Sequence, residues 1–130
     1  MDVSALLEAA RRASTRAYAP YSKLRVGCVI ESADGELFAG CNVENASYGL
    51  TICAERAAIC AAVAAGARSF RRIGLYSSAK RLITPCGACR QVLAELAPKA
   101  QIWMTCANGE KRRRSVSQLL PDQFSKDGWK

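Results

Sequence analysis

The sequence contains no histidine in its 130 residues. This absence excludes Ser-His-Asp triads, Cys-His nucleophile pairs and every zinc site that uses imidazole. Any metal ion must therefore be held by sulfur or oxygen. Acid–base chemistry must use Asp, Glu, Lys, Tyr, Cys or water.

Long apolar runs are also missing. The longest stretch without a charged residue spans only residues 57–67, whereas a membrane-spanning helix needs about 20 apolar residues. The start of the chain lacks the apolar core of a signal peptide. The seven cysteines are an odd number, which argues against a closed disulfide framework. We therefore expect a cytoplasmic protein without a membrane segment, whose cysteines favour metal binding over disulfides.

The residues that are present are typical of one α/β domain over residues 1–130. They are 50% hydrophobic and 23% charged, as in an ordinary globular protein. The apolar and turn patterns predict helices over residues 2–17, 52–65, 86–97 and 117–120, and strands over 25–32, 37–43, 72–77, 101–106 and 111–116. Helices that alternate with strands after an opening hairpin predict a mixed sheet with helices on its faces.

The helix predicted over residues 52–65 is apolar on all sides in its body. Such a helix must be buried all round. In a domain this small, that indicates burial against a second subunit as well as against its own core. The cysteines outside the motifs described below are expected to be small buried apolar residues, namely Cys28, Cys41, Cys60 and Cys106.

The net charge is +8, and the densest basic cluster covers residues 111–114. Such a cluster is either a solvated turn or edge strand or part of a nucleic-acid surface. No aromatic residue is interleaved with these charges in the sequence, as a platform that stacks single-stranded bases would require. The sequence therefore favours a solvated segment and no nucleic-acid partner.

Two short motifs carry the residues suited to metal and proton chemistry. The first is Cys53-Ala54-Glu55, at the start of the apolar helix, and the second is Pro85-Cys86-Gly87-Ala88-Cys89, at the start of the next helix. A Cys-x-x-Cys pair places two sulfurs within reach of one zinc ion, and Cys53 would supply a third. Three protein ligands leave the fourth tetrahedral position open to water, as in catalytic zinc sites.

The position of these cysteines at helix starts has a physical reason. Unpaired backbone N–H groups and the helix dipole stabilise a thiolate over a thiol. Three thiolates on a dication leave a net charge of about −1, which weakens the metal as a Lewis acid. We expect a nearby cation to offset this charge, and the sequence offers Arg56 and, second, Arg90.

Glu55 follows Cys53 too closely for both to bind the metal easily from one helical turn, but it is well placed to contact a water on the metal. A carboxylate there can accept the proton of that water and pass it on. A Cys-x-x-Cys alone would fit a structural zinc module equally well. Cys-x-Glu followed by Pro-Cys-x-x-Cys matches the zinc deaminase signature, in which the Glu is not a ligand.

With these motifs in view, the chain resembles the cytidine and deoxycytidylate deaminase superfamily, and within it the small homotetrameric cytidine deaminases. The resemblance rests on Ala19-Pro20-Tyr21-Ser22-Lys23, Val26-Gly27, residues 40–49, Cys53-Ala54-Glu55-Arg56 and residues 85–93. It implies a three-layer α/β/α fold with a five-stranded mixed sheet and helices on both faces. It also implies one zinc ion per chain and a homotetramer with shared active sites.

The resemblance assigns roles to the metal and base-binding residues. Cys53, Cys86 and Cys89 would hold the zinc. Zinc-bound hydroxide would attack C4 of the base, while Glu55 moves protons to N3 and to the departing amine. The backbone of Ala54, together with Glu55, would read the pyrimidine edge. Arg56 would donate hydrogen bonds to the thiolates, in line with the charge argument.

The resemblance also assigns roles around the sugar. Asn42 and Glu44 would bind the ribose hydroxyls. Their alternation with an apolar residue points both side chains the same way in an extended segment, although an ordinary strand-end loop has the same pattern. Tyr48 would reach into the site of a neighbouring subunit, and Phe124 would cover the base of a neighbour's ligand. Simple packing is the other interpretation of these two aromatic residues.

One residue departs from the family pattern. Leu24 stands where the family usually has Phe in the wall of the nucleoside pocket. Leucine keeps this wall apolar but loses an aromatic face, which is a contact of about 0.5–1.5 kcal/mol.

The implied function is the hydrolytic deamination of cytidine and 2′-deoxycytidine to uridine and 2′-deoxyuridine plus ammonia, in pyrimidine salvage. Three rivals remain open. A deaminase of nucleoside-like antibiotics of the blasticidin type shares the zinc motifs, but Asn42 and Glu44 argue against it. A polynucleotide deaminase would use the positive charge and would depend on salt. A zinc module without activity would tolerate the loss of Glu55.

Overall fold

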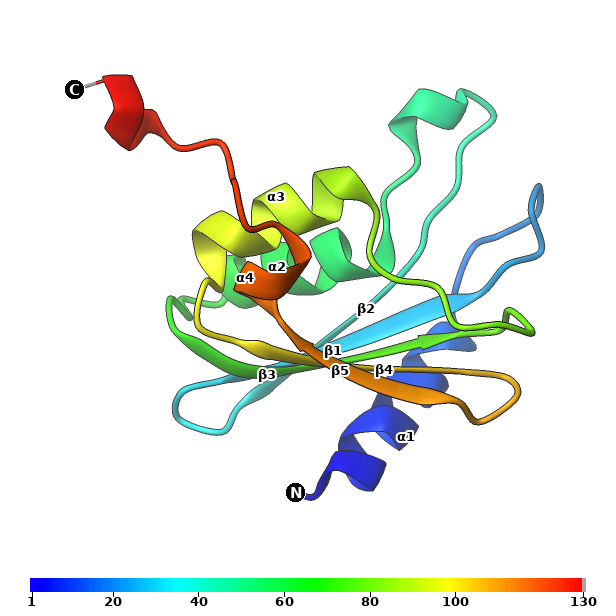
Figure 1. Cartoon of the computed structure of the whole chain (residues 1–130). Helices are drawn as coiled ribbons and strands as arrows, with labels where there is room; N and C mark the ends of the chain where they lie inside the picture. Colours follow the sequence, from blue (N-terminus) through cyan, green and yellow to red (C-terminus); the bar gives the residue numbers. More distant parts are fainter. Residues whose placement is uncertain (130) are drawn as a thin grey trace.

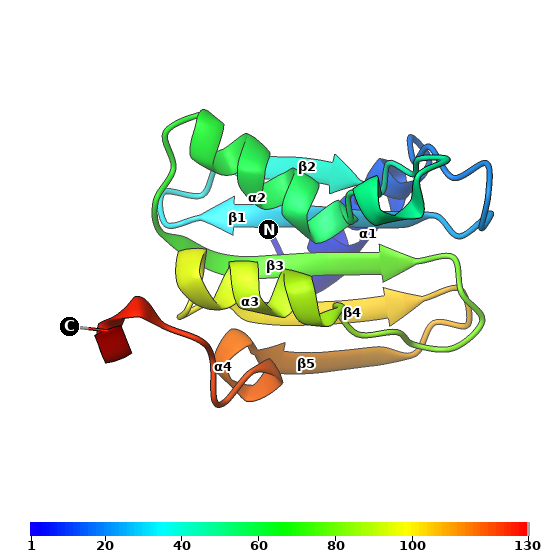
Figure 2. The same cartoon turned by 90° about the horizontal axis from the view of Figure 1, so that it is seen from above.

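The computed structural model describes residues 1–129, which form a five-stranded sheet in the order β2-β1-β3-β4-β5 (Figures 1 and 2). The strands are β1 (Val26–Ser32), β2 (Leu37–Cys41), β3 (Phe70–Ser77), β4 (Gln101–Cys106) and β5 (Lys111–Ser115). The helices are α1 (Val3–Ser14), α2 (Ala54–Ala64), α3 (Gly87–Leu96) and α4 (Val116–Leu119), with short 3-10 turns at Tyr48–Leu50 and Lys126–Trp129.

The sheet is mixed and is covered on both faces. β1 is antiparallel to β2 and β3, β3 is parallel to β4, and β5 is antiparallel to β4. Helix α1 lies on one face, whereas α2 and α3 lie side by side on the other (Figures 1 and 2). The structure thus confirms the predicted three-layer α/β/α fold with a five-stranded mixed sheet.

The topology explains why α2 and α3 begin at the same edge of the sheet. β2 and β3 run in the same direction, because each is antiparallel to β1. Helix α2 follows β2 and α3 follows β3, so both helices start beyond the carboxyl ends of parallel-running strands. This is the edge at which open α/β sheets bind ligands.

Two glycines let the helices approach the sheet closely. A Cβ atom added to Gly40 in β2 would lie 2.4 Å from the Ala58 nitrogen and 2.7 Å from the Ala54 oxygen of α2. A Cβ atom added to Gly27 in β1 would lie 2.0 Å from the Ala10 oxygen of α1. These obstacles are backbone atoms, so a larger residue would displace the helix.

The core lies mainly between the sheet and the α2–α3 layer. Its largest fully buried side chains include Ile30, Ile59, Ile73, Leu93 and Met104, drawn from three strands and both helices. On the other face, Leu6 and Ala10 of α1 pack against Val29. Full burial of each large side chain contributes about 1.5–3 kcal/mol.

The ends of several elements differ from the prediction. The first helix stops at Ser14 rather than at residue 17, because Tyr18 leaves the helix to form a bridge with Val43. The second strand stops at Cys41 rather than at residue 43, since Val43 also pairs with Ile52. The basic cluster forms β5, an edge strand, as one of the two sequence interpretations expected.

One face of α2 is exposed in the single chain. Cys60, Ala61 and Ala64 are exposed, while Ala58 and Ile59 are buried against the core. The prediction that Cys60 is a buried residue is therefore wrong for the single chain, because Cys60 faces away from the sheet. Cys28 and Cys106 are buried as predicted, and Cys41 is half-buried.

Candidate active site and metal centre

Three thiols meet where α2 and α3 begin. Cys53 is the residue that caps the start of α2, Cys86 caps the start of α3, and Cys89 lies in the first turn of α3. Neither capping thiol accepts a hydrogen bond from the backbone N–H groups at the start of its helix, so both sulfurs are available to a metal ion. The three Sγ atoms lie within 4.8 Å of one another, and those of Cys53 and Cys86 are 3.8 Å apart.

This spacing fits one tetrahedral zinc ion. With Zn–S bonds of about 2.3 Å, tetrahedral geometry places neighbouring sulfurs about 3.8 Å apart. Three sulfur ligands leave a fourth position free for water or substrate, which is characteristic of catalytic zinc. The donor set therefore suits zinc well, and Cys53, Cys86 and Cys89 can hold a metal ion.

The surroundings favour a thiolate at Cys53. Hydrogen bonds from the Cys89 thiol and from Arg56 outweigh partial burial and lower the pKa of Cys53 to about 5. The hydrogen bond with Cys53 and burial raise the pKa of Cys89 in turn. The first negative charge of the cluster therefore resides on Cys53, the thiol to which Arg56 donates a hydrogen bond.

Arg56 is the cation on the sulfur cluster. Its Nη2 donates to Cys53 Sγ at 3.5 Å and lies 3.4 Å from the Thr51 carbonyl oxygen. The hydrogen bond with Cys53 is the main cause that raises the pKa of Arg56. Its Nε is a buried nitrogen without a hydrogen-bond partner among residues 1–129.

The second candidate cation, Arg90, has other partners. Its guanidinium donates to the Pro85 carbonyl at 2.8 Å, to the Thr84 hydroxyl at 2.7 Å and to the Leu119 carbonyl at 2.9 Å. Arg90 thus holds the loop before α3 and the end of α4 together. Of the two arginines considered from the sequence, the structure places only Arg56 in hydrogen-bond contact with a sulfur of the cluster.

Glu55 lies in the first turn of α2 and is only 5% exposed. Burial raises the pKa of its carboxyl to about 7, and the Cys53 charge adds to this effect while Arg56 opposes it. A carboxyl with such a pKa can both accept and release a proton near neutral pH.

A cavity of about 320 Å³ contains most of the predicted site residues. Its walls include Leu24, Asn42, Glu44, Cys53, Ala54, Glu55 and Cys86. Sequence reasoning missed Ser22, Val26, Thr51, Leu75, Ile83 and Thr84, which also line it. Ser22 lies within a recognised motif, but the apolar residues carry no chemical signal because their strand or loop position alone brings them here.

Asn42 and Glu44 both line the cavity, and each also has a structural contact. Asn42 Nδ2 donates to the Leu24 carbonyl at 2.8 Å, and its Oδ1 accepts from the Val26 N–H at 2.9 Å. The Glu44 carboxylate accepts hydrogen bonds from the loop at Tyr21 and Ser22. The hydrogen bond from the Ser22 hydroxyl is the main cause that lowers the pKa of Glu44.

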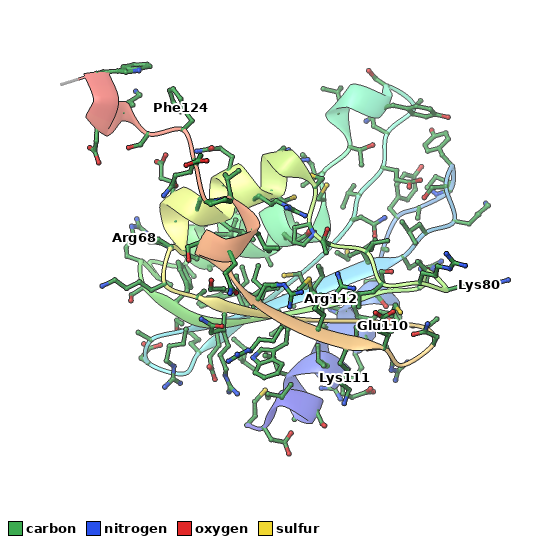
Figure 3. All side chains as sticks on the ribbon, in the orientation of Figure 1. Arg68, Lys80, Glu110, Lys111, Arg112 and Phe124 are labelled. Carbon is green, nitrogen blue, oxygen red and sulfur yellow. The ribbon has the colours of Figure 1, made fainter. Side chains whose placement is uncertain are left out.

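Tyr48 and Phe124 are not walls of this cavity in their own chain. Tyr48 is 74% exposed and packs edge-on against Tyr21 with ring centroids 5.8 Å apart, beside an adjoining cavity of about 290 Å³. Phe124 is 59% exposed and lies on the C-terminal segment that projects away from the sheet (Figure 3). Gln91 of α3 donates to its carbonyl at 3.1 Å.

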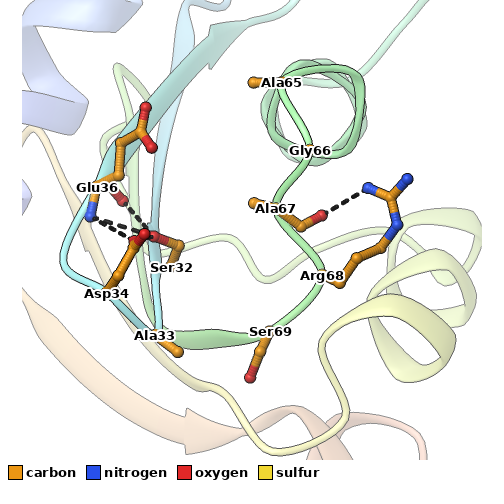
Figure 4. A pocket seen from close by; sticks show the side chains of 9 residues that line it. All are labelled: Ser32, Ala33, Asp34, Glu36, Ala65, Gly66, Ala67, Arg68 and Ser69. Atoms are coloured by element: carbon orange, nitrogen blue, oxygen red, sulfur yellow. Dashed lines mark hydrogen bonds between the residues drawn. The ribbon is translucent and has the colours of Figure 1, made fainter.

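A further hollow of about 370 Å³ lies at the opposite end of α2, between the β1–β2 turn and the loop before β3 (Figure 4). Two of its polar side chains, those of Ser32 and Arg68, already have partners within the chain. Ser32 donates to Asp34, and Arg68 donates to the carbonyls of Val63 and Ala67 at 2.9 Å. Two of the cysteines and the buried Glu55 carboxyl line the other cavity, at the start of α2.

The fold and the three-sulfur centre define a zinc-binding α/β/α protein with an open metal position. The family model described as "Cytidine and deoxycytidylate deaminase zinc-binding region" matches residues 1–106. The chain belongs to this family.

Full-length relatives agree with this assignment. A cytidine deaminase of Sporosarcina psychrophila is 41% identical over 128 residues, covering 98% of this chain and 94% of the relative. A cytidine deaminase of Halalkalibacterium halodurans is 43% identical over 126 residues, covering 96% of each. The crystal structure of a cytidine deaminase from Burkholderia pseudomallei superposes with a TM-score of 0.91 at 48% identity, covering 95% of this chain and 100% of that one.

Among residues 1–129, no helix is both long and apolar enough to cross a membrane.

Proposed function

We propose that the cavity at the start of α2 is the active site for hydrolytic deamination of cytidine to uridine and ammonia. The reaction follows from family membership and from relatives that span the whole chain and are named for it. The observation that carries the residue assignment is the meeting of three thiols and the buried Glu55 carboxyl, with Glu55, Cys53 and Cys86 lining one cavity. Bound zinc supplies the Lewis acidity that makes water a nucleophile near neutral pH.

Glu55 moves the protons in this proposal. Its carboxylate accepts a proton from the attacking water and delivers it to N3 of the base, which makes C4 more electrophilic. It then takes the remaining proton from the new hydroxyl on C4 and transfers it to the amino group. The amino group leaves as ammonia while the C4 carbonyl forms, so water and cytidine are converted to uridine and ammonia. The pKa of about 7 supports both steps, because acceptance and release then have similar free energies.

Leu24, Asn42, Ala54 and Glu44 position the nucleoside. The backbone of Ala54 contacts the pyrimidine edge, and Leu24 forms the apolar wall of the base site. Asn42 and Glu44 receive the sugar hydroxyls, since an amide and a carboxylate together suit a diol. Because a pocket of this kind holds either sugar, we expect both cytidine and 2′-deoxycytidine to be substrates.

The active protein is proposed to be a homotetramer with shared sites. The exposed apolar face of α2 supports burial against another copy. Tyr48 and Phe124 are exposed and lie outside the cavity of their own chain, which suits roles in a neighbour's site. We place the enzyme in the cytoplasm, in pyrimidine salvage.

A panel of substrates tests the proposed function. The purified zinc-loaded protein should release ammonia from cytidine and 2′-deoxycytidine but not from blasticidin-type antibiotics. It should also leave cytosine in single-stranded DNA unchanged at low and high salt, whereas a polynucleotide deaminase would act there and would lose activity as salt rises. Turnover of the antibiotic alone, or of the polynucleotide alone, would refute the proposed substrate.

A further inference from the structure

Ser22, in the loop from Pro20 to Leu24, takes no part in the proposed proton transfers. The Ser22 hydroxyl donates a hydrogen bond to Glu44 Oε2 and accepts one from the Leu24 N–H at 3.0 Å. Glu44 Oε1 accepts the N–H groups of Tyr21 at 3.0 Å and of Ser22 at 3.2 Å. The loop therefore surrounds one carboxylate with directed donors.

These contacts determine which hydrogen-bonding positions remain for a ligand. A carboxylate has about four acceptor positions. The loop occupies two on Oε1 and one on Oε2 of Glu44, which leaves one position on Oε2. The single hydrogen of the Ser22 hydroxyl is already donated to Glu44, so Ser22 has none to offer a ligand. Glu44 can accept a hydrogen bond from a ligand hydroxyl, whereas Ser22 has no hydrogen left to donate to one.

The backbone of the same loop is strained. Lys23 has a φ of 63°, the left-handed region that residues with a Cβ atom rarely adopt. Its N–H donates to the Ala19 carbonyl at 3.1 Å. Such strain persists only where surrounding contacts determine the conformation, and it is concentrated at ligand sites.

We propose that Ser22 is a positioning residue for sugar recognition, which holds Glu44 so that the free acceptor of Oε2 is directed at a hydroxyl of the nucleoside sugar. This inference rests on the proposed function, because it takes the ligand to be a nucleoside and Glu44 to contact its sugar. The hydrogen bond from Ser22 also lowers the pKa of Glu44 and so favours its ionised form.

The base wall is held by a separate contact. Asn42 Nδ2 donates to the Leu24 carbonyl at 2.8 Å, and Asn42 Oδ1 accepts from the Val26 N–H. Leu24 therefore keeps one anchor when the Ser22 hydroxyl is removed. Loss of that hydroxyl acts on sugar binding and leaves the base site in place.

The test compares two nucleosides with the same base, cytidine and 2′,3′-dideoxycytidine, of which the second lacks both hydroxyls on the ring. In Ser22→Ala we expect the KM for cytidine to rise about tenfold with kcat changed by less than about twofold. For dideoxycytidine both constants should change by less than about twofold. Ser22→Thr keeps a hydroxyl and should restore the cytidine KM.

Two further variants separate positioning from a general effect on the fold. Ser78→Ala removes a hydroxyl that accepts a hydrogen bond from the Arg25 N–H at 3.0 Å beside the start of β1. This variant should leave KM and kcat unchanged for both nucleosides. Lys23→Val retains Ser22 but disfavours the left-handed turn, so it should reproduce the selective rise in KM.

If Ser22→Ala raised the KM equally for both nucleosides, or for neither of them, the positioning role would be overturned. The deaminase function would remain intact in either case. Failure of the proposed function would be distinct, because the unmodified zinc-loaded protein would then not convert cytidine at all, and both proposals would fall.

Discussion

At the scale of single residues, charge balance governs the metal centre. Three thiolates exceed the charge of one zinc ion, and Arg56 is the cation bonded to Cys53. A partner of this kind holds its ligand in place and reduces the excess negative charge around the metal. Its buried Nε lies without a hydrogen-bond partner in the described part of the chain, whereas its Nη2 donates to Cys53 and to the Thr51 carbonyl.

The hydrogen bond from Arg56 to Cys53 should contribute to zinc affinity. Arg56→Gln should weaken zinc binding about 10- to 100-fold, because the thiolates lose their neighbouring cation. Competition with a chelator of known affinity measures the change. Arg68→Gln is the control, since Arg68 is exposed and donates to carbonyls near the other end of α2. Equal zinc affinity in both variants would refute the role of Arg56.

The sequence predicted residues that belong to a short motif. It did not predict which side chains are in contact when the residues are far apart in the chain. Cys53, Cys86 and Cys89 could be identified because a motif and a ligand set coincide. The sequence offered both Arg56 and Arg90 as the compensating cation, and only side-chain geometry separates them. Ser22 was missed as a site residue because its partner Glu44 is distant in the chain.

At the scale of elements, close packing of α2 on β2 places the metal centre. Gly40 provides the space for this approach, and Cys53 lies immediately before α2. Gly40→Ala should lower the free energy of unfolding by about 1–3 kcal/mol, because the new methyl group meets helix backbone. Denaturant unfolding measures this loss, and zinc affinity should fall with it as Cys53 shifts.

Gly49→Ala is the matched control for this substitution. A Cβ atom at Gly49 meets no atom within 4 Å, so its effect should stay within about 0.5 kcal/mol. If Gly40→Ala were as stable as Gly49→Ala, the proposed contact between α2 and β2 would be wrong.

A cross-strand ion pair makes the stability of the sheet depend on pH. Glu31 of β1 is buried and accepts from Arg72 of β3 at 2.8 and 2.9 Å. The hydrogen bonds from Arg72 lower the pKa of Glu31 below its usual value of 4.5. The folded state therefore binds this proton less readily than the unfolded chain, so the stabilisation is complete above the unfolded pKa and is lost as pH falls through the folded pKa.

Glu31→Gln tests this dependence. At about pH 7 the substitution should lower the free energy of unfolding by about 1–3 kcal/mol, and this difference from the unmodified protein should shrink below about pH 4.5. Urea unfolding at several pH values measures it. Glu36→Gln, at an exposed position in the β1–β2 turn, should show little effect at any pH. A difference for Glu31→Gln that does not change with pH would contradict the account.

Element type was predictable from pattern, whereas element ends were not. Periodicity identified the strands and the main helices, and β4 was predicted with its observed bounds. The ends of α1 and β2 depend on Tyr18, Val43 and Ile52, which pair across distant parts of the chain. Local propensity does not contain this information.

At the scale of the whole molecule, the exposed face of α2 allows a test of the proposed homotetramer. Ala61→Glu places a charge on this face without disfavouring the helix. We expect light scattering to show a species smaller than the homotetramer proposed for the unmodified protein, because burial of an unpaired charge is costly. Ala107→Glu, on the exposed β4–β5 turn, should leave the assembly unchanged. A stable monomer in the unmodified protein would contradict the shared-site proposal for Tyr48 and Phe124.

Connection rules made the global fold predictable. A hairpin followed by two strand–helix–strand crossovers allows few arrangements, and both crossover helices must start at the same sheet edge when their strands run in parallel. The sequence did not contain the orientation of the C-terminal segment, which projects away from the sheet in the single chain (Figure 1). The hydrogen bond from Gln91 to the Phe124 carbonyl joins residues that are far apart in the chain, and no local pattern predicts it.

The most direct test of the central claim is cytidine turnover by the unmodified protein and by Glu55→Gln, each with its zinc content measured. The ultraviolet change from cytidine to uridine gives the rate. We expect about one zinc ion per chain in both proteins and a loss of kcat of at least about 100-fold in Glu55→Gln, because the proton carrier is gone while the sulfur ligands remain. A normal rate in zinc-loaded Glu55→Gln would contradict the proposed mechanism.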